Sequence, residues 1–271
     1  LFNRDIEKAV IPSIAIEIFH NFTLLHDDIM DKSNIRRGRE SVYKKWNSDI
    51  ALLSGDAMSI IATKYLNKAP ENNQAIMETF TDAALKVCEG QQYDMDFEKQ
   101  SNLHVDDYLK MISLKTGALL AVSPKIGALM ANAHQNDVDY LYEFGLNLGL
   151  AFQLQDDWMD CFGNQEKFGK TIGEDIINNK KTYLLIKARE LADSKQKSAL
   201  ENAIRDENIA NKEKIKIVKD IYLKTGVEKL LDKKVNHLFA KSEDALNNVS
   251  VETRKKEDLY KILSYIRNRN S

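Results

Sequence analysis

Two clusters of aspartates with the same internal spacing are the residues best suited to do chemistry in this sequence. Their members are Asp27, Asp28 and Asp31, and then Asp156, Asp157 and Asp160. In a helix, residues four apart share a face, so the first and last aspartate of each cluster would project together. Two such carboxylates repel each other unless a cation lies between them. Mg²⁺ prefers oxygen ligands of this kind and often completes its shell with phosphate oxygens. The repeated spacing therefore predicts magnesium sites for a phosphorylated substrate.

A third acidic pair, Asp106-Asp107, shows how specific this spacing is. The pair is followed by Tyr108, Leu109 and Lys110, so it lacks the third aspartate. Acidic residues often begin helices, because the helix dipole favours negative charge at that end. We interpret this pair as a helix cap. The two complete clusters, about 130 residues apart, favour a functional site.

Basic residues accompany both clusters. They are Arg36 and Arg37 after the first, Lys115 in mid-chain, and Lys170, Lys180 and Lys181 after the second. Mg²⁺ alone does not neutralise a diphosphate, and arginine and lysine donors would complete its binding site. A solvated surface pair is the alternative interpretation of Lys180-Lys181.

Helices must position these clusters, because apolar residues recur at helical spacing along most of the chain. The expected helical segments are Ile6–Met30, Ile50–Leu66, Pro70 to about Glu98, Val105–Ala133, Val138–Asp160, Thr182–Leu191, and amphipathic segments from about Lys195 to the end. We expect Pro124 to kink or divide its helix, and Gly145 and Gly149 to permit close helix packing. Asp31–Lys45 and Phe162–Asn179 are expected to be irregular.

Composition supports one class of fold and excludes several functions. Only 3 prolines and 11 glycines occur in 271 residues, which disfavours a sheet-rich fold, and we expect no strand. The predicted fold is all-α, in a single domain over residues 1–271. A net charge of -2 gives no support for nucleic-acid binding. Cys88 and Cys161 lie far apart, which favours a reducing, cytoplasmic location. No apolar run approaches the ~20 residues needed to span a membrane, so none is expected to do so.

A series of motifs around the clusters follows one order and spacing. The segments are Phe19–Asp31, Arg36–Gly38, Ser54–Asp56, Gly90–Asp94, Lys115–Gly117, Phe152–Asp157 and Gly169–Lys180. Together they closely resemble the trans-isoprenyl diphosphate synthase family, also called polyprenyl synthetases. Some of these motifs are weak alone, but in this order they are specific.

The resemblance implies an all-α, single-domain helical bundle with a central cavity, which forms a homodimer. The two aspartate clusters would face each other across the mouth of the cavity. It implies a prenyltransferase, a farnesyl or geranylgeranyl diphosphate synthase of the short-chain type. Such an enzyme condenses isopentenyl diphosphate with an allylic diphosphate (dimethylallyl, geranyl or farnesyl). The products are an all-trans C15–C20 prenyl diphosphate and diphosphate, formed by ionisation, condensation and elimination.

The resemblance also implies roles for individual residues. Three Mg²⁺ ions would be held on the allylic diphosphate by Asp27, Asp31 and Asp156, with Asp28, Asp157 and Asp160 in support. That diphosphate would be bound by Arg36, Lys115, Lys170 and Lys180. Isopentenyl diphosphate would be bound by Arg37 and His20. The developing carbocation would lie beside Thr116 and Gln153. The residues expected to be catalytic are thus Lys115, Thr116, Gln153 and Lys170.

His20 and the start of the chain bear on the second substrate. A lone histidine on an apolar helix is usually a core residue, but His20 lies seven residues before Asp27, on nearly the same face. This placement favours the ligand interpretation. The family carries a Gly-Lys-Arg segment near its N-terminus that helps to bind isopentenyl diphosphate, and none precedes Asp27 here. We expect the first tens of residues of the protein to be missing from this sequence.

Product length should depend on the cavity floor below Asp27. Phe22 is the fifth residue before Asp27, Thr23 is the fourth, and no insertion separates Asp28 from Asp31. In the family, this pattern resembles that of C15 to C20 synthases. The alternative is that Phe22 simply packs in the core.

Two other functions compete with this interpretation. A class I terpene cyclase shares the first cluster, but its second metal site normally uses Asn, Ser or Thr, and Glu. A non-catalytic partner subunit of another prenyl synthase tends to lose aspartates, whereas all six are present here.

Overall fold

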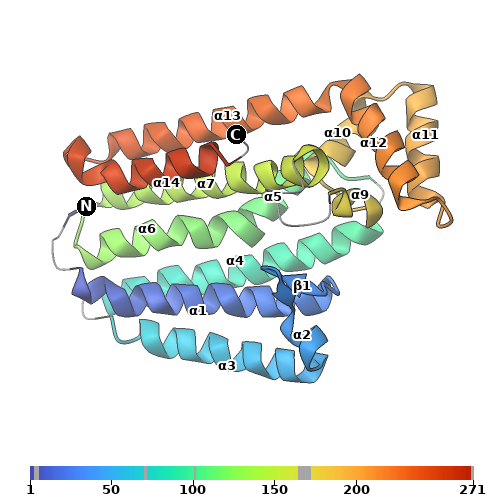
Figure 1. Cartoon of the computed structure of the whole chain (residues 1–271). Coiled ribbons are helices and arrows are strands. Elements are labelled where there is room, and N and C mark those ends of the chain that lie inside the picture. Colours follow the sequence, from blue (N-terminus) through green and yellow to red (C-terminus); the bar gives the residue numbers. More distant parts are fainter. Residues whose placement is uncertain (3–5, 70–71, 101, 164–171, 270–271) are drawn as a thin grey trace. The chain divides into compact units, whose positions relative to one another are not determined.

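The computed structural model describes all residues except 3–5, 70–71, 101, 164–171 and 270–271 (Figure 1). Helices dominate the described chain, which confirms the all-α prediction. Contacts divide the chain into two compact units, residues 1–83 with 122–142, and residues 84–121 with 143–271. The expectation of a single domain over residues 1–271 stays a prediction.

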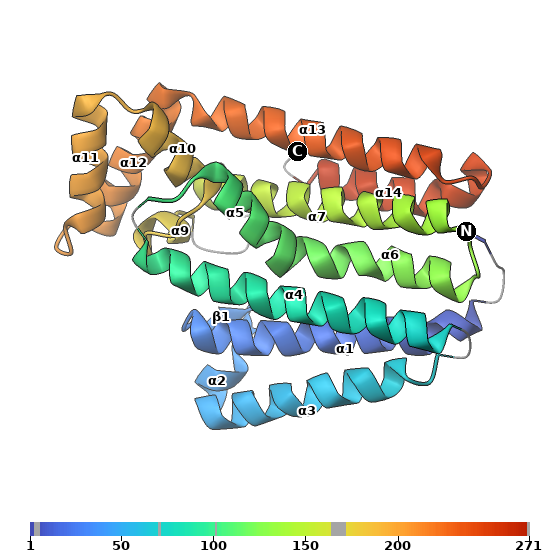
Figure 2. The same cartoon turned by 180° about the vertical axis from the view of Figure 1, so that it is seen from behind.

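Unit 1 is built on two long helices that lie side by side (Figures 1 and 2). They are α1 (Glu7–Met30) and α3 (Ser48–Leu66), and between them lie β1 (Ile35–Arg36), β2 (Arg39–Glu40) and α2 (Val42–Lys45). The side chain of Asn47 begins α3 by accepting a hydrogen bond from the backbone N–H of Ile50 at 2.8 Å. Phe19 of α1 is 4% exposed and packs edge-on against Phe80, so one face of α1 is tied to the core of this unit.

The short hairpin between α1 and α3 corrects the expectation that no strand occurs. β1 and β2 pair antiparallel, with Arg36 opposite Arg39. The two turn residues between them, Arg37 and Gly38, have φ values of 53° and 74°. Left-handed values at both positions are typical of a tight hairpin turn, which glycine accepts without strain. Each strand has only two residues, so alternation of apolar and polar residues gave no signal.

Three helices contribute residues to both units. They are α4 (Asn73–Lys99), α6 (Ala118–Met130) and α7 (Gln135–Phe162). The rest of unit 2 consists of α5 (Val105–Ile112), η1 (Ser113–Gly117), α9 (Glu174–Ile177), α10 (Tyr183–Leu191), α11 (Ser194–Arg205), α12 (Asn211–Thr225), α13 (Val227–Asn248), η2 (Thr253–Lys256) and α14 (Glu257–Arg267).

The helix expected over residues 105–133 is interrupted at a different place from the one predicted. Pro124 lies inside α6 without dividing it, and the break is the π-helical segment η1. A π turn accommodates extra residues in a helix and often occurs at functional sites. Here it contains Lys115, Thr116 and Gly117, which the sequence had identified as a motif.

The predicted close approach at Gly145 and Gly149 is confirmed within unit 2. A Cβ atom on Gly145 would lie 2.3 Å from the carbonyl oxygen of Leu120, and one on Gly149 would lie 3.0 Å from the Cα atom of Gly117. These two glycines therefore let α7 lie directly against the backbone of α6 and η1.

Helix α1 also differs from the expectation that no segment could span a membrane. Within the described residues, it is the one helix that is long and apolar enough to do so, with a mean hydropathy of 1.2 over its best window. This finding rests on length and composition alone, and the core helix of a soluble protein can have the same length and composition.

A buried lysine closes the C-terminus of α13. The ammonium group of Lys256 donates to the carbonyl oxygens of Leu246 and Asn247 at 3.0 Å and of Val249 at 2.9 Å. Lys256→Met is expected to lower the free energy of unfolding by about 3 kcal/mol, because it removes the charged donor that these three carbonyl groups share. Chemical denaturation measures the change. Lys255→Met is the control, since Lys255 is exposed, and an equal loss in both variants would contradict this account.

Candidate active site

The first aspartate cluster closes the C-terminal end of α1. Asp27 and Asp28 lie in its last turn, and Asp31 is the C-cap residue, whose backbone N–H donates to the carbonyl of Asp27 at 2.8 Å. The helix thus ends at the cluster, as the sequence had indicated. The side chain of Asp27 is 20% exposed, whereas that of Asp28 is 4% exposed.

Arg36 of β1 binds both of the neighbouring carboxylates. Its Nε and Nη2 atoms donate to Oδ1 of Asp28 at 2.9 and 2.7 Å, and Nη2 also donates to Oδ2 of Asp27 at 3.2 Å. The hairpin therefore returns this guanidinium to the end of α1. The Arg36 guanidinium is therefore held beside the first cluster, where it could also donate hydrogen bonds to a diphosphate.

His20 lies within the electrostatic reach of both hairpin arginines. Burial is the largest cause that lowers its pKa, and the positive charges of Arg37 and Arg36 lower it further, against the opposing effect of Glu17. Unit 1 thus brings together three of the residues predicted to bind substrate. Their assignment to particular diphosphates stays a prediction.

The residues predicted to set product length lie on α1 as expected. Phe22 is partly buried. The centroid of its ring lies 5.2 Å from that of Phe19 and 4.7 Å from that of His26. Thr23 turns its hydroxyl back to the helix and donates to the carbonyl of His20 at 2.7 Å. Both ring partners of Phe22 lie on α1 itself.

The motif Ser54–Asp56 is explained by His26. A Cβ atom on Gly55 would lie 2.3 Å from Nε2 of His26, so only glycine lets α3 lie against this imidazole. The same nitrogen lies 3.1 Å from the carbonyl oxygen of Leu52 and 3.8 Å from Asp56. The sequence had identified the motif but not its partner.

The second aspartate cluster lies near the C-terminal end of α7, in unit 2. The side chain of Asp156 is 32% exposed and accepts a hydrogen bond from Arg269, which follows α14. The same guanidinium stacks on the ring of Phe152, 4.2 Å from its centroid. In both clusters, an arginine forms an ion pair with the first aspartate, which is more exposed than the second.

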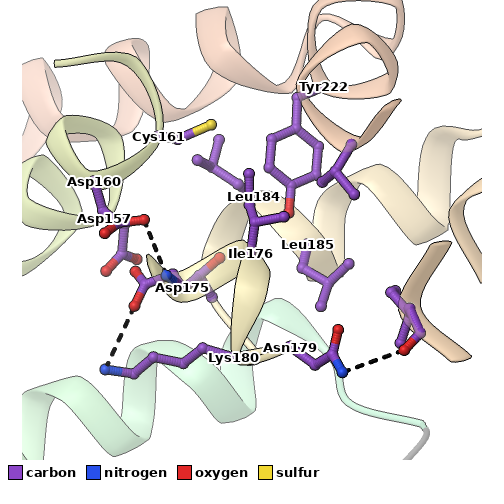
Figure 3. Close-up of a pocket in the computed structure, with 13 residues that line it drawn as sticks. Asp157, Asp160, Cys161, Asp175, Ile176, Asn179, Lys180, Leu184, Leu185 and Tyr222 are labelled. Carbon is purple, nitrogen blue, oxygen red and sulfur yellow. Dashed lines mark hydrogen bonds and ion pairs between the residues drawn. The ribbon is translucent and has the colours of Figure 1, made fainter. Parts of the chain in front are cut away.

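Asp157 and Asp160 are buried and border a pocket in unit 2 (Figure 3). Burial, which is the largest cause, and the negative charge of Asp175 together raise the pKa of Asp157 to about 8 and that of Asp160 to about 7. A divalent cation beside these carboxylates would favour their charged forms.

Asp175 of α9 is an acidic neighbour that the sequence did not identify. Its backbone N–H donates to Oδ2 of Asp160 at 3.1 Å, and its carboxylate lies 3.9 Å from Nζ of Lys180 (Figure 3). Gly173, with a φ of 86°, begins α9 and donates its N–H to the carbonyl of Asp160. This loop therefore brings Lys180 into the neighbourhood of the second cluster. Lys170 lies outside the described residues.

The π-helical segment η1 contributes the remaining predicted residues. Nζ of Lys115 donates to the carboxylate of Asp94 on α4 at 2.7 Å, and the hydroxyl of Thr116 donates to Oε1 of Gln153 on α7 at 3.0 Å. A Cβ atom on Gly90 would lie 2.3 Å from the backbone nitrogen of Lys115. The motif Gly90–Asp94 thus supports the lysine in two ways, by close contact and by an ion pair.

The pair Asp106-Asp107 is confirmed as a helix cap. The carboxylate of Asp107 accepts a hydrogen bond at 3.0 Å from the backbone N–H of His104, immediately before α5. The following residue, Tyr108, is the functional candidate that the sequence missed. Its hydroxyl donates to Oδ2 of Asp157 at 2.5 Å. No sequence signal pointed to it, because the two residues are 49 positions apart.

The carboxylates suit a hard divalent cation, although the described residues contain no ready-made group of three His, Cys, Asp or Glu ligands. Mg²⁺ usually takes one or two carboxylates and completes its shell with water and phosphate oxygens. The partly exposed Asp27 and Asp156 fit that role. Asp27 would supply oxygen ligands in unit 1, and Asp156 would supply them in unit 2.

Comparison with known proteins finds relatives of this chain. A family model described as polyprenyl synthetase matches residues 1–222. A geranylgeranyl diphosphate synthase of Sulfolobus acidocaldarius is 37% identical over 255 residues, which cover 92% of this chain and 77% of that protein. A short chain isoprenyl diphosphate synthase of Methanocaldococcus jannaschii is 38% identical over 220 residues, or 79% and 67% of the two chains.

Solved structures agree with the sequence relatives. The crystal structure of geranylgeranyl pyrophosphate synthetase from Pyrococcus horikoshii has a TM-score of 0.90 and 32% identity to this chain. The match covers 97% of this chain and 80% of that one.

Proposed function

The chain belongs to the polyprenyl synthetase family, and from this premise we propose that it joins isopentenyl diphosphate to an allylic diphosphate. The enzyme is a prenyltransferase, and its products are a longer all-trans prenyl diphosphate and diphosphate. The observation that carries the proposal is the pair of complete aspartate clusters. The first aspartate of each cluster forms an ion pair with an arginine, Arg36 for Asp27 and Arg269 for Asp156. A terpene cyclase or a non-catalytic subunit is not favoured, because all six aspartates are present.

The proposed reaction first forms an allylic cation and a diphosphate anion. Carbon–carbon bond formation and loss of a proton then remove the positive charge. Bound Mg²⁺ supplies Lewis-acid stabilisation of the departing diphosphate. Arg36, Lys115 and Lys180 would donate hydrogen bonds to the same oxygens as the allylic C–O bond breaks. The double bond of isopentenyl diphosphate then attacks the allylic carbon, and the proton lost from the product passes to the released diphosphate. Thr116 and Gln153 direct oxygen atoms toward the positive charge, and Arg37 and His20 bind the second substrate.

The finer features of the proposal rest on family membership and composition. We propose three Mg²⁺ ions, held by Asp27, Asp31 and Asp156, a homodimer, and a cytoplasmic location. Lys170 completes the diphosphate site. The product is C15 to C20, which agrees with the names of the geranylgeranyl and short chain synthases reported above.

Radiolabelled isopentenyl diphosphate tests the proposal directly. The purified protein is incubated with it, with Mg²⁺ and with dimethylallyl, geranyl or farnesyl diphosphate in turn. A linear labelled prenyl diphosphate is expected with at least one starter. A cyclic hydrocarbon from the allylic substrate alone would indicate a cyclase, and no incorporation with any starter would indicate a partner subunit.

Replacing Phe22 is expected to change product length. Phe22→Ala removes the ring five residues before Asp27, so the growing chain should extend by at least one isoprene unit. Chromatography of the products measures the length. Ser13→Ala is the control, because Ser13 also lies on α1 and its hydroxyl bonds only its own helix among the contacts described. Equal product lengths from wild type and Phe22→Ala would show that the ring is not the floor.

A further inference from the structure

Asp157 is held by two hydrogen bonds from neutral side chains in unit 2. The hydroxyl of Tyr108 donates to its Oδ2 atom at 2.5 Å, and Nε2 of Gln153 donates to its Oδ1 atom at 3.3 Å. Asp157 is 4% exposed and Tyr108 is 2% exposed. Both carboxylate oxygens therefore have protein donors in a buried setting, which is unlike a site prepared for a hydrated cation.

The first cluster shows the same division between neighbouring aspartates. Asp28 is 3% exposed and accepts two hydrogen bonds from Arg36, while Asp27 beside it is more accessible. In the second cluster, Asp156 is the accessible member and Asp157 the buried one. The second aspartate of each cluster thus contacts a residue that the proposed reaction uses, Arg36 in one case and Gln153 in the other.

The hydrogen-bond chain continues from Asp157 to the segment η1. Nε2 of Gln153 is the donor to Asp157, so the NH₂ group of this amide is turned toward the carboxyl group. Its carbonyl oxygen then faces Thr116 and accepts the single hydroxyl proton of that residue at 3.0 Å. With this proton committed, the Thr116 oxygen offers only lone pairs to any other neighbour. Oriented oxygen dipoles of this kind stabilise positive charge in a transition state.

We propose that Asp157 is a positioning residue rather than a metal ligand, and that Tyr108 holds it so that Gln153 and Thr116 keep their oxygens directed to the allylic cation. This inference rests on the proposed function, because it assigns a role within the same reaction. It adds Tyr108 to the site and gives Asp157, which was expected only to support the Mg²⁺ ligands, a role in orienting Gln153. Hydrogen-bonded side chains act as a unit, so loss of either end should disturb the whole chain.

Metal binding separates a positioning role from a ligand role. Mn²⁺ is titrated in the presence of inorganic diphosphate, and the free ion is followed by electron paramagnetic resonance. Asp156→Asn is expected to weaken Mn²⁺ binding by about tenfold, and Asp157→Asn by less than about twofold. Weakening by Asp157→Asn equal to that by Asp156→Asn would overturn the inference. No effect of Asp156→Asn would instead contradict the proposed metal site.

Kinetics test the hydrogen-bond chain itself. Tyr108→Phe keeps the buried ring and removes the donor, and we expect kcat to fall about tenfold with KM for both substrates and Mn²⁺ binding unchanged. Asp157→Asn should lower kcat about a hundredfold, since an amide keeps only one acceptor oxygen for the two donors Tyr108 and Gln153. Tyr222→Phe is the matched control, because Tyr222 is a buried tyrosine of unit 2 that lines the pocket bordered by Asp157, and it should retain full activity. Full kcat in Tyr108→Phe, or an equal loss in Tyr222→Phe, would contradict the assignment.

Discussion

Asparagine in place of Asp156 is expected to lower kcat/KM by about a thousandfold, the largest effect of any single change in unit 2. The substitution keeps the size of the side chain and removes the negative charge that would hold Mg²⁺ on the departing diphosphate. Asp156 is the accessible carboxylate of its cluster, with a side chain that is 32% exposed. Steady-state kinetics at saturating Mg²⁺ measures the loss, and higher Mg²⁺ should recover only part of it.

The acidic pair Asp106-Asp107, which lacks the third aspartate, supplies the control for this prediction. Asp106→Asn also removes an aspartate charge from unit 2, but at an exposed position at the start of α5. Its activity should stay within about twofold of wild type, because exposed substitutions away from special features usually have small effects. Equal losses in Asp106→Asn and Asp156→Asn would show that general acidity matters, and not the spacing of the cluster.

Alanine in place of Gly90 is expected to cost about 3 kcal/mol of unfolding free energy, a large effect for the addition of one methyl group. Gly90 is buried, and a Cβ atom there would lie 2.3 Å from the backbone nitrogen and 2.7 Å from the Cα atom of Lys115. Backbone atoms have no flexible end that can move aside. The segment η1 must therefore shift away from α4, which should also weaken the ion pair between Lys115 and Asp94.

Gly127→Ala is the matched control for this second prediction. Gly127 lies inside α6, and nothing lies within 4 Å of the position that its Cβ atom would take. Alanine there should raise the unfolding free energy by about 0.5–1 kcal/mol, because it removes the entropic cost of a helical glycine. Denaturant unfolding of both variants provides the measurement. A Gly90→Ala protein as stable as wild type would contradict the close contact at Lys115.

The sequence predicted helix content and both aspartate clusters because these signals are local. Helical periodicity depends on residues three and four apart, and each cluster spans five positions. The ends of α1 and α7 therefore fell close to the predicted places. The break at η1 was placed wrongly at Pro124, because a π turn has no composition signal, whereas proline has a strong one.

The contacts that complete the candidate site are the part that the sequence did not reveal. Tyr108 follows the pair Asp106-Asp107 directly and has no feature that marks it in the sequence. Its hydroxyl nevertheless donates a hydrogen bond to Asp157, 49 positions away. Arg269 lies 113 positions from Asp156. Pairs at such separations are brought together only by the fold, so no spacing rule could predict them. The hairpin that returns Arg36 to Asp28 was also missed, because its strands are too short to show a pattern.

One measurement tests the central claim most directly, the stoichiometry of the reaction with labelled isopentenyl diphosphate, Mg²⁺ and an allylic starter. Product is analysed by chromatography and mass spectrometry while released inorganic diphosphate is counted. The account predicts one diphosphate released for each isopentenyl unit incorporated, in a linear prenyl diphosphate of C15 to C20. Diphosphate release without incorporation of label, or no reaction with any of the three starters, would contradict it.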